Sequence, residues 1–204
     1  MEAILDLYNQ EYNPKIPTIC FDEKSLQLLE DTKPVVKADK AGKIQKRDYE
    51  YKRNGTANIF CTVEPLAGNH ITEVFEKKTR NEFAQNLKII SEAYPDADYI
   101  NIVMDNLNTH NERSLIEYYG ENEGKEIWNR FKVFYTPKHA SWLNQAEIEI
   151  GICSKQCIGK KRFGNLGLLK NEVKAWNKAV NGKRLKTNWS FSTKEARLKF
   201  KYMR

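Results

Sequence analysis

Residues 99–110 read Tyr-Ile-Asn-Ile-Val-Met-Asp-Asn-Leu-Asn-Thr-His, and the rest of the chain can be understood as support for the carboxylate among them. The apolar run from Ile100 to Met104 is short and rich in β-branched side chains, which predicts a strand buried on both faces. Asp105 follows this strand directly, where α/β sheets place ligand-binding groups at the carboxyl ends of their strands. Taken alone, Asp105 would more simply cap a turn, so its interpretation depends on companions elsewhere in the chain.

Two other segments supply such companions. Residues 16–23 form a short apolar stretch that predicts a strand ending in a carboxylate, Asp22. Residues 131–137 predict a third strand, which leads through residues 138–144 into a helical segment that contains Glu147. Three carboxylates are therefore expected to converge from two strand ends and one helix start. Hard divalent cations prefer such oxygen ligands, and two of them can clamp the attacking and leaving oxygens of a phosphodiester.

Three blocks of the sequence resemble the signature blocks of bacterial insertion-sequence transposases of the mariner superfamily, the six-thirty group. These blocks are Phe21-Asp-Glu23, Met104-Asp-Asn-Leu-Asn-Thr-His110 and Thr136-Pro-Lys-His-Ala-Ser-Trp-Leu-Asn-Gln-Ala-Glu147. Residues 53–58, 64–68 and 188–193 also resemble the family, so the similarity covers nearly the whole chain. The family uses an Asp, Asp, Glu triad on a ribonuclease-H-like fold.

The resemblance implies an α/β, ribonuclease-H-like domain with a mixed five-stranded sheet and helices on both faces. It also implies cleavage and strand transfer of DNA that depend on two Mg²⁺ (or Mn²⁺) ions. Asp22 and Asp105 would hold both ions, and Glu147 would complete the second site. The expected partners are double-stranded DNA, as transposon ends and target, and a second copy of the chain. Two alternatives stay open: a non-catalytic DNA-binding remnant of a transposase, and a ribonuclease-H-like nuclease that acts on RNA–DNA hybrids.

Length and charge agree with a single domain that binds a polyanion. The chain has 204 residues and a net charge of +7, from 34 Lys and Arg against 27 Asp and Glu. No apolar run is long enough to span a bilayer, so we expect no membrane partner and a cytoplasmic location. Only about fifteen residues precede the first predicted strand. We therefore expect residues 1–204 to lack a helix-turn-helix recognition module, which an upstream polypeptide would supply.

Both Glu147 and Glu149 are candidates for the third carboxylate. In a helix from Leu143 to Cys157, at about 100° per residue, the apolar positions surround Glu147 and leave Glu149 on the opposite side. The sequence therefore predicts that Glu147 is enclosed by apolar surface and that Glu149 is solvated or faces DNA. Glu147 also lies three residues after Asn144, which matches the family's Asn-x-x-Glu spacing.

Several residues near the third block and after it are candidates for contacts with DNA. His139 lies where it would approach a phosphate, while ordinary core packing is the alternative to a role of Trp142 in wedging the duplex. The predicted DNA-contact set is Lys138, His139, Trp142, Asn144, Lys160, Lys161 and Arg162.

The remaining patterns give local predictions. Residues 30–47 are polar and Lys-rich, which predicts a long exposed loop, and Asn54-Gly55 predicts a hairpin turn. Residues 79–82 and 109–112 each have the pattern of a capping box that opens a helix. The four cysteines are expected to be buried thiols, and the three histidines are too scattered to make a metal motif.

Overall fold

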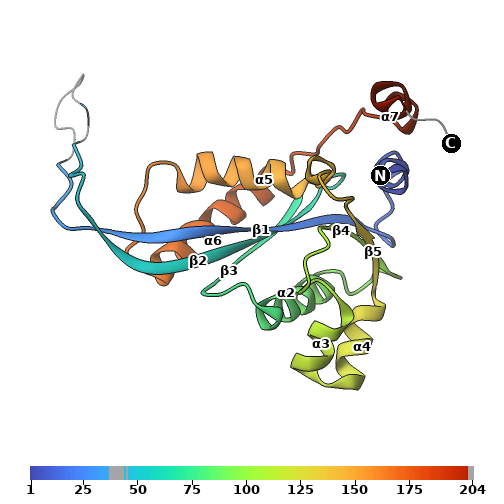
Figure 1. The fold of residues 1–204 in the computed structure, drawn as a ribbon, viewed down its shortest axis with the longest axis horizontal. Coiled ribbons are helices and arrows are strands. Elements are labelled where there is room, and N and C mark those ends of the chain that lie inside the picture. The colour runs from blue at the N-terminus through green and yellow to red at the C-terminus, as the bar shows by residue number, and fades with distance from the viewer. Residues whose placement is uncertain (37–43, 45, 202–204) are drawn as a thin grey trace.

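The computed structural model describes residues 1–36, 44 and 46–201, which form one mixed sheet with helices on both faces (Figure 1). The strand order is β3-β2-β1-β4-β5. The antiparallel part comprises β1 (Thr18–Asp31), β2 (Tyr51–Glu64) and β3 (Asn69–Phe75). The parallel part adds β4 (Ile100–Met104) and β5 (Phe131–Tyr135). The predicted α/β class and mixed five-stranded sheet are confirmed.

Strand β1 is much longer than the sequence predicts, and this changes where Asp22 lies. The strand pairs with β4 only from Thr18 to Cys20, while its pairing with β2 continues to Asp31. Asp22 is opposite Cys61 of β2, inside the strand. The prediction that Asp22 ends its strand is therefore wrong, because β2 continues the hydrogen-bonded ladder after β4 has ended.

The helices divide between the two faces of the sheet. One face is covered by α2 (Arg80–Ala93), α3 (Glu112–Tyr119) and α4 (Glu121–Asn129), which pack on Ile19 and Phe21 of β1. The other face is covered by α1 (Glu2–Tyr8), α5 (Ala146–Cys153), α6 (Leu166–Lys183) and α7 (Thr193–Phe200). Because strand side chains alternate between faces, Cys20 joins this second core. All four cysteines are buried free thiols, as predicted.

Strands β1 and β2 continue beyond the rest of the sheet as a long two-stranded arm (Figure 1). Asn54-Gly55, predicted to turn a hairpin, instead lies within β2. Between two pairs, Gln27 with Thr56 and Leu29 with Arg53, β1 advances by two residues and β2 by three. The φ of +91° at Gly55 accommodates this irregularity, as in a bulge.

The predicted loop at 30–47 is also partly strand. Residues 30 and 31 end β1, and Val36 forms a bridge with Lys46. Lys37, Lys40 and Lys43, which the loop prediction includes, lie outside the described residues. The first residues of the predicted loop, Glu30 and Asp31, thus continue the sheet.

The two predicted capping boxes have different outcomes. Thr79 caps α2 as expected, and the Glu82 side chain accepts from the Thr79 backbone. Helix α3 instead begins after Asn111, without a side-chain cap. Thr109 uses its carbonyl to accept a hydrogen bond of 2.6 Å from the Ser114 hydroxyl. Among the described residues, no helix is long and apolar enough to cross a membrane.

The predicted helix at 143–157 consists of several pieces. A short 3₁₀ turn, η1 (Ser141–Leu143), precedes α5, and the π-helical turn η2 (Ser154–Ile158) continues α5 to its end. The element that presents Glu147 is therefore a short α-helix that begins immediately before it.

Candidate active site

Asp22 and Asp105 lie on the same face of the sheet, at the junction of its parallel and antiparallel parts. Cys20 and Val103 are paired neighbours on β1 and β4, and both side chains belong to the core under α1, α5 and α7. The period of two along each strand places Asp22 and Asp105 on this face as well. Two residues that are 83 positions apart in the sequence are thus brought to one edge by strand register.

Asn144 fixes the segment that carries Glu147 to the strand that carries Asp22. Its side-chain amide donates a hydrogen bond of 2.8 Å to the carbonyl of Phe21, and its Oδ1 accepts from the backbone N–H of Ala146 at 3.2 Å. The Tyr8 hydroxyl donates to the Leu143 carbonyl at 2.7 Å and secures the same segment from α1. The prediction that Asn144 contacts DNA is wrong, because this residue is 2% exposed and its side chain forms hydrogen bonds within the protein.

The pKa of Asp22 depends on its burial and on the neighbouring carboxylates. Burial is the largest influence that raises the pKa of Asp22, to about 6. The negative charges of Glu23, Asp105 and Glu147 contribute to the same rise, and a hydrogen bond of 2.8 Å from the backbone N–H of Glu23 opposes it. Like charges that are held close disfavour one another's ionised form. Asp105 and Glu147 are thus near enough to Asp22 to disfavour its ionised form, although burial has the larger effect.

His110 is a site residue that the sequence interpretation missed. Its Nδ1 lies 2.7 Å from Oδ1 of Asp105, and its Nε2 lies 3.5 Å from Oε2 of Glu23. The imidazole stacks on Phe83 at 4.6 Å between centroids and meets the edge of Phe21 at 5.4 Å. The signal available in the sequence was the second block itself, which ends with His110 five residues after Asp105.

The charge of His110 follows from its neighbours. Burial lowers the pKa of His110, but the hydrogen bonds and negative charges of Asp105 and Glu23 outweigh burial and raise it to about 9. In return, the His110 contact holds the pKa of Asp105 below its usual range. His110 is therefore a cation at neutral pH, and it orients Asp105 from beneath the site.

The environments of the two glutamates on α5 are the reverse of the prediction. Glu147 is exposed, whereas Glu149 is 8% exposed, and its Oε2 lies 3.4 Å from Nδ1 of His70. The predicted burial of Glu147 was wrong because it rested only on the positions of apolar residues around the helix. Helix α5 packs against β1 and β2, Glu149 lies beside His70 of β3, and the side of α5 that carries Glu147 borders Asp22.

The oxygen-rich character of the site fits a hard divalent cation. Asp105 receives both of its side-chain contacts, from His110 and from the backbone N–H of Leu107 at 3.3 Å, on Oδ1. Its Oδ2 has no contact within the described residues, and Glu147 is exposed. In the part of the chain that the structure describes, no three His, Cys, Asp or Glu side chains already converge as a metal cage. The donor set therefore suits Mg²⁺ or Mn²⁺, while coordination requires the carboxylates to move together.

The predicted DNA-contact residues divide into two groups. Lys138 and His139 are exposed in the segment after β5, where His139 has a φ of +63°, and Trp142 is 39% exposed nearby. Lys160 and Lys161 lie at the arm, where they line a cavity of about 390 Å³ together with Arg47 and Ile44.

Arg162 has a structural role at the outer end of the β1–β2 ladder. Its guanidinium donates to Oδ1 of Asp31 at 2.8 Å and to the carbonyls of Asp48 and Glu50 at 3.1 Å. It also lies over the Tyr51 ring, 5.0 Å from the centroid. The prediction that Arg162 contacts DNA is therefore corrected: its guanidinium is already bonded within the protein.

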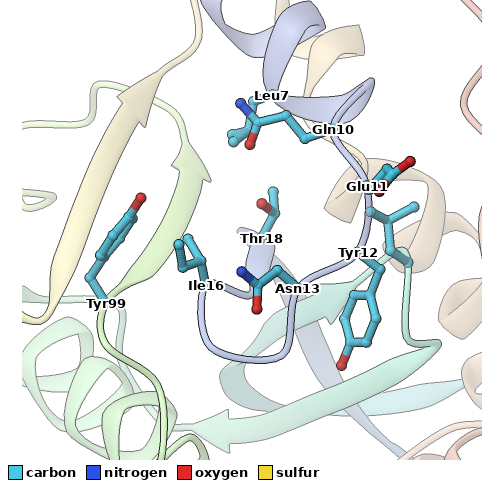
Figure 2. A pocket seen from close by; sticks show the side chains of 9 residues that line it. Leu7, Gln10, Glu11, Tyr12, Asn13, Ile16, Thr18 and Tyr99 are labelled. Atoms are coloured by element: carbon cyan, nitrogen blue, oxygen red, sulfur yellow. The ribbon is translucent and has the colours of Figure 1, made fainter.

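A separate pocket of about 160 Å³ lies at the opposite end of the parallel strands (Figure 2). Thr18 and Tyr99, at the amino ends of β1 and β4, contribute to it, whereas Asp22 and Asp105 follow the segment over which the two strands pair. Its lining contains a single carboxylate, Glu11. This pocket therefore does not belong to the acidic site.

Comparisons with known proteins agree with this geometry. The family model of the DDE superfamily endonuclease matches residues 17–170. The Mos1 mariner paired end complex with Mn shares the fold with a TM-score of 0.59 and 13% identity, over 90% of this chain and 56% of that chain. The Mos1 strand transfer complex gives 0.58 and 13%, over 87% and 51%.

These structural matches confirm the predicted ribonuclease-H-like fold. A third match, the Mos1 paired end complex with Mg, has a TM-score of 0.57 and 12% identity, over 90% of this chain and 54% of that chain. The chain thus spans about half the length of these transposases. No curated protein matches it.

Proposed function

Because the chain belongs to the DDE superfamily of endonucleases, we propose that it is the catalytic domain of a bacterial insertion-sequence transposase that cleaves DNA and transfers strands. The observation that carries this proposal is the electrostatic coupling of Asp22 to Asp105 and Glu147 at one edge of the sheet. The printed descriptions of the structural neighbours name DNA-end complexes and the ions Mn and Mg, which supports DNA and divalent cations as ligands here.

Each carboxylate has a separate task in this proposal. Asp22 and Asp105 would hold two Mg²⁺ or Mn²⁺ ions from the sheet, and Glu147 would complete the second site from α5. The chemistry that the bound ions supply is a lowered pKa of the attacking water or 3′-hydroxyl and charge stabilisation at the leaving oxygen. His110 donates to Asp105 and thereby keeps it ionised and oriented.

The basic residues would hold the DNA around this centre. Lys138 and His139 would contact phosphates beside the acidic site, and Lys160 and Lys161 would contact the duplex along the arm. Such contacts position the backbone but read little sequence. Sequence recognition would come from an upstream polypeptide, and pairing of two DNA ends from a second copy of the chain.

A cleavage and joining assay tests the proposal. The purified chain is incubated with supercoiled plasmid and a short duplex that has a free 3′-hydroxyl, with Mg²⁺, Mn²⁺ or EDTA. We expect metal-dependent nicking and insertion of the duplex, reduced about a hundredfold or more in Asp22→Asn, Asp105→Asn and Glu147→Gln. Glu126→Gln, on the exposed surface of α4, is the matched control and should retain activity.

The same assay separates the alternatives. Cleavage of an RNA–DNA hybrid without strand transfer would replace the transposase by a ribonuclease-H-like nuclease. A melting temperature that does not respond to Mg²⁺, together with intact DNA binding and no nicking, would identify a non-catalytic DNA-binding protein. Full activity of folded Asp105→Asn protein would overturn the catalytic assignment.

A further inference from the structure

The connection between β3 and α2 carries a cation beside the acidic site. This connection, Glu76-Lys-Lys-Thr79, follows β3 directly. Strands β1 and β3 both run antiparallel to β2, while β4 and β5 run parallel to β1, so β3, β4 and β5 all point in one direction. Their carboxyl ends therefore lie toward one edge of the sheet. Lys78 comes after the first of these strands, Asp105 after the second and Lys138 after the third.

The connection is anchored at both of its ends, which limits where Lys78 lies. The carbonyl of Glu76 accepts a hydrogen bond of 3.1 Å from the Asn58 side chain on β2. At the other end, Thr79 is the N-cap of α2 and takes part in its capping box. A backbone that is held on both sides of Lys78 keeps the ammonium group near the carboxyl end of β3.

The start of α2 lies beside the segment that carries Asp105. Phe83, one turn into α2, stacks on His110 at 4.6 Å between ring centroids, and Nδ1 of His110 lies 2.7 Å from Oδ1 of Asp105. The hydrogen bond from His110 is the largest influence that lowers the pKa of Asp105, and the positive charge of Lys78 acts in the same direction. Lys78 is therefore close enough to the acidic site for its charge to be felt there.

Lys78 is available to an anion that enters the site. Its side chain is exposed, and it forms no ion pair with any other residue that the structure describes. The neighbouring cations are engaged elsewhere. Arg80 contacts Glu117 at 2.9 Å, and Lys77 lines a different cavity of about 570 Å³, at the start of α6. Among these three cations, only Lys78 combines an unpaired ammonium group with proximity to Asp105.

The position of Lys78 defines the chemistry of the anion. In the strand order, Lys78 after β3 and Lys138 after β5 lie on opposite sides of Asp105, which follows β4. A DNA strand that crosses this edge of the sheet would meet one cation on each side of the phosphodiester at the carboxylates. An ammonium group binds phosphate oxygens as a compact point charge and reads no base.

On the basis of the proposed function, we propose that Lys78 is a substrate-binding residue, whose ammonium group holds a backbone phosphate next to the phosphodiester on which the acidic site acts. The contact lies on the β3 side of the site, away from Lys138 and His139. It positions the reacting strand without selecting its sequence, so its loss weakens the binding of every DNA sequence alike.

Replacement of single phosphates by neutral methylphosphonates tests the proposal. The probe is a DNA hairpin with one free end that carries a 3′-hydroxyl, and the methylphosphonate is moved one phosphate at a time along both strands from that end. Affinity is measured by fluorescence anisotropy with Ca²⁺ in place of Mg²⁺. We expect the wild-type protein to lose about tenfold in affinity at each contacted phosphate. Lys78→Ala should bind unmodified DNA about tenfold more weakly and should be insensitive to the methylphosphonate at one of these positions.

Two matched variants identify the charge and its place. Lys78→Arg keeps a cation and should restore both the affinity and the sensitivity at that position. Lys77→Ala removes the adjacent charge and should keep the wild-type pattern. The slope of log affinity against log salt concentration should fall by about one in Lys78→Ala. The slope of Lys77→Ala should stay that of the wild type.

The outcomes separate this contact from the function on which it rests. Wild-type affinity of Lys78→Ala would overturn the contact and leave the transposase proposal intact. A loss that adds to that of the methylphosphonate at every position would show that Lys78 acts only through the charge of Asp105, and would also overturn it. Equal effects of Lys77→Ala and Lys78→Ala would reduce the contact to general attraction, with the same consequence. Absence of any DNA binding by the wild-type protein would refute both proposals. If Lys78→Ala does not fold, Lys78→Gln, which removes only the charge, decides.

Discussion

Two histidines of this chain are buried beside carboxyl groups, one on each face of the sheet. His110 lies under α2 and contacts Asp105 at 2.7 Å and Glu23 at 3.5 Å. His70, on β3, lies beside Trp176 of α6 and is 3.4 Å from Glu149 of α5. The residue types and the depth of burial are similar, yet the protonation that each environment favours is opposite.

The difference follows from the number and exposure of the partners. Two carboxylates act on His110, and one of them, Asp105, has a half-exposed side chain that remains hydrated when ionised. Their charges raise the pKa of His110 to about 9 despite burial. Burial lowers the pKa of His70, as does the positive charge of Arg184.

Burial also raises the pKa of Glu149, so both members of the His70 pair are driven toward their uncharged forms. The pair is a packing contact that seats α5 on the sheet. The His110 group is an electrostatic anchor for the acidic site. A buried histidine beside a carboxylate is thus not one structural motif but two.

The largest expected effect comes from removal of His110. His110→Ala leaves the Glu23 side chain, which is 6% exposed, without its cationic neighbour, and this should cost about 3 kcal/mol of stability at pH 7. The folded pKa of about 9 lies above the usual 6.5, so the contribution of His110 is full below pH 6.5 and disappears as pH rises through 9. Urea unfolding at pH 6, 7 and 10 should therefore show the mutational cost shrinking at alkaline pH.

His70→Ala and His139→Asn sharpen this comparison. His70→Ala removes a buried imidazole whose charge is not required, and we expect a cost of about 2 kcal/mol without the alkaline dependence. His139 is exposed with a positive φ, which Asn tolerates, so His139→Asn should be nearly neutral. Equal costs and equal pH profiles for His110→Ala and His70→Ala would remove the distinction between the two pairs.

Asp22→Asn should stabilise the protein while it abolishes cleavage. The folded pKa of Asp22, about 6, lies above the ordinary 3.8, so its contribution to stability is full below pH 3.8 and is lost as pH rises through 6. In EDTA at pH 8 the ionised side chain costs about 3 kcal/mol, which the amide avoids. Unfolding free energies of the two proteins should converge near pH 4.

Mg²⁺ provides the internal control for this prediction. Bound cations neutralise the repulsion, so Mg²⁺ should raise the melting temperature of the wild-type protein more than that of Asp22→Asn. An Asp22→Asn protein that is less stable than the wild type at pH 8 in EDTA would show that burial and repulsion do not destabilise the ionised form of Asp22.

The sequence predicted the sheet better than it predicted the surroundings of each carboxylate. The buried strand before Asp105 is specified by a local apolar run, and the three-block resemblance makes Asp22, Asp105 and Glu147 the candidate triad. The length of β1, however, depends on its pairing with β2, and the Asn54-Gly55 pattern is equally compatible with a turn and with a bulge. Local patterns do not contain this information, because pairing is a long-range choice.

The prediction of which α5 glutamate is buried was wrong for a related reason. A helical stripe shows which side chains share a side, but not which side meets the sheet and which meets the acidic site. His110 was undervalued because its partners, Glu23 and the ring of Phe83, come from segments distant in sequence. Strand register and helix docking, which fix these contacts, become visible only in three dimensions.

The smallest expected effect comes from Glu149→Gln, and it tests the reversed assignment of the two glutamates directly. Glu149 lies about 200° around α5 from Glu147, and its contact with His70 joins groups that burial drives toward neutrality. Glutamine has nearly the same shape and keeps an uncharged polar group beside the imidazole, so the change in stability should stay below about 1 kcal/mol.

Glu147→Gln is the matched variant on the same helix, and the two substitutions should have complementary effects. Because Glu147 is exposed, its replacement should leave urea unfolding unchanged but remove metal-dependent nicking, whereas Glu149→Gln should retain nicking. Glu149→Ala should lower stability clearly more than Glu149→Gln, because the cavity leaves His70 without its neighbour. If folded Glu149→Gln protein loses nicking while Glu147→Gln retains it, Glu149 is the third carboxylate. Its contact with His70 would then be part of the active site, and the contrast between the two histidines would fail.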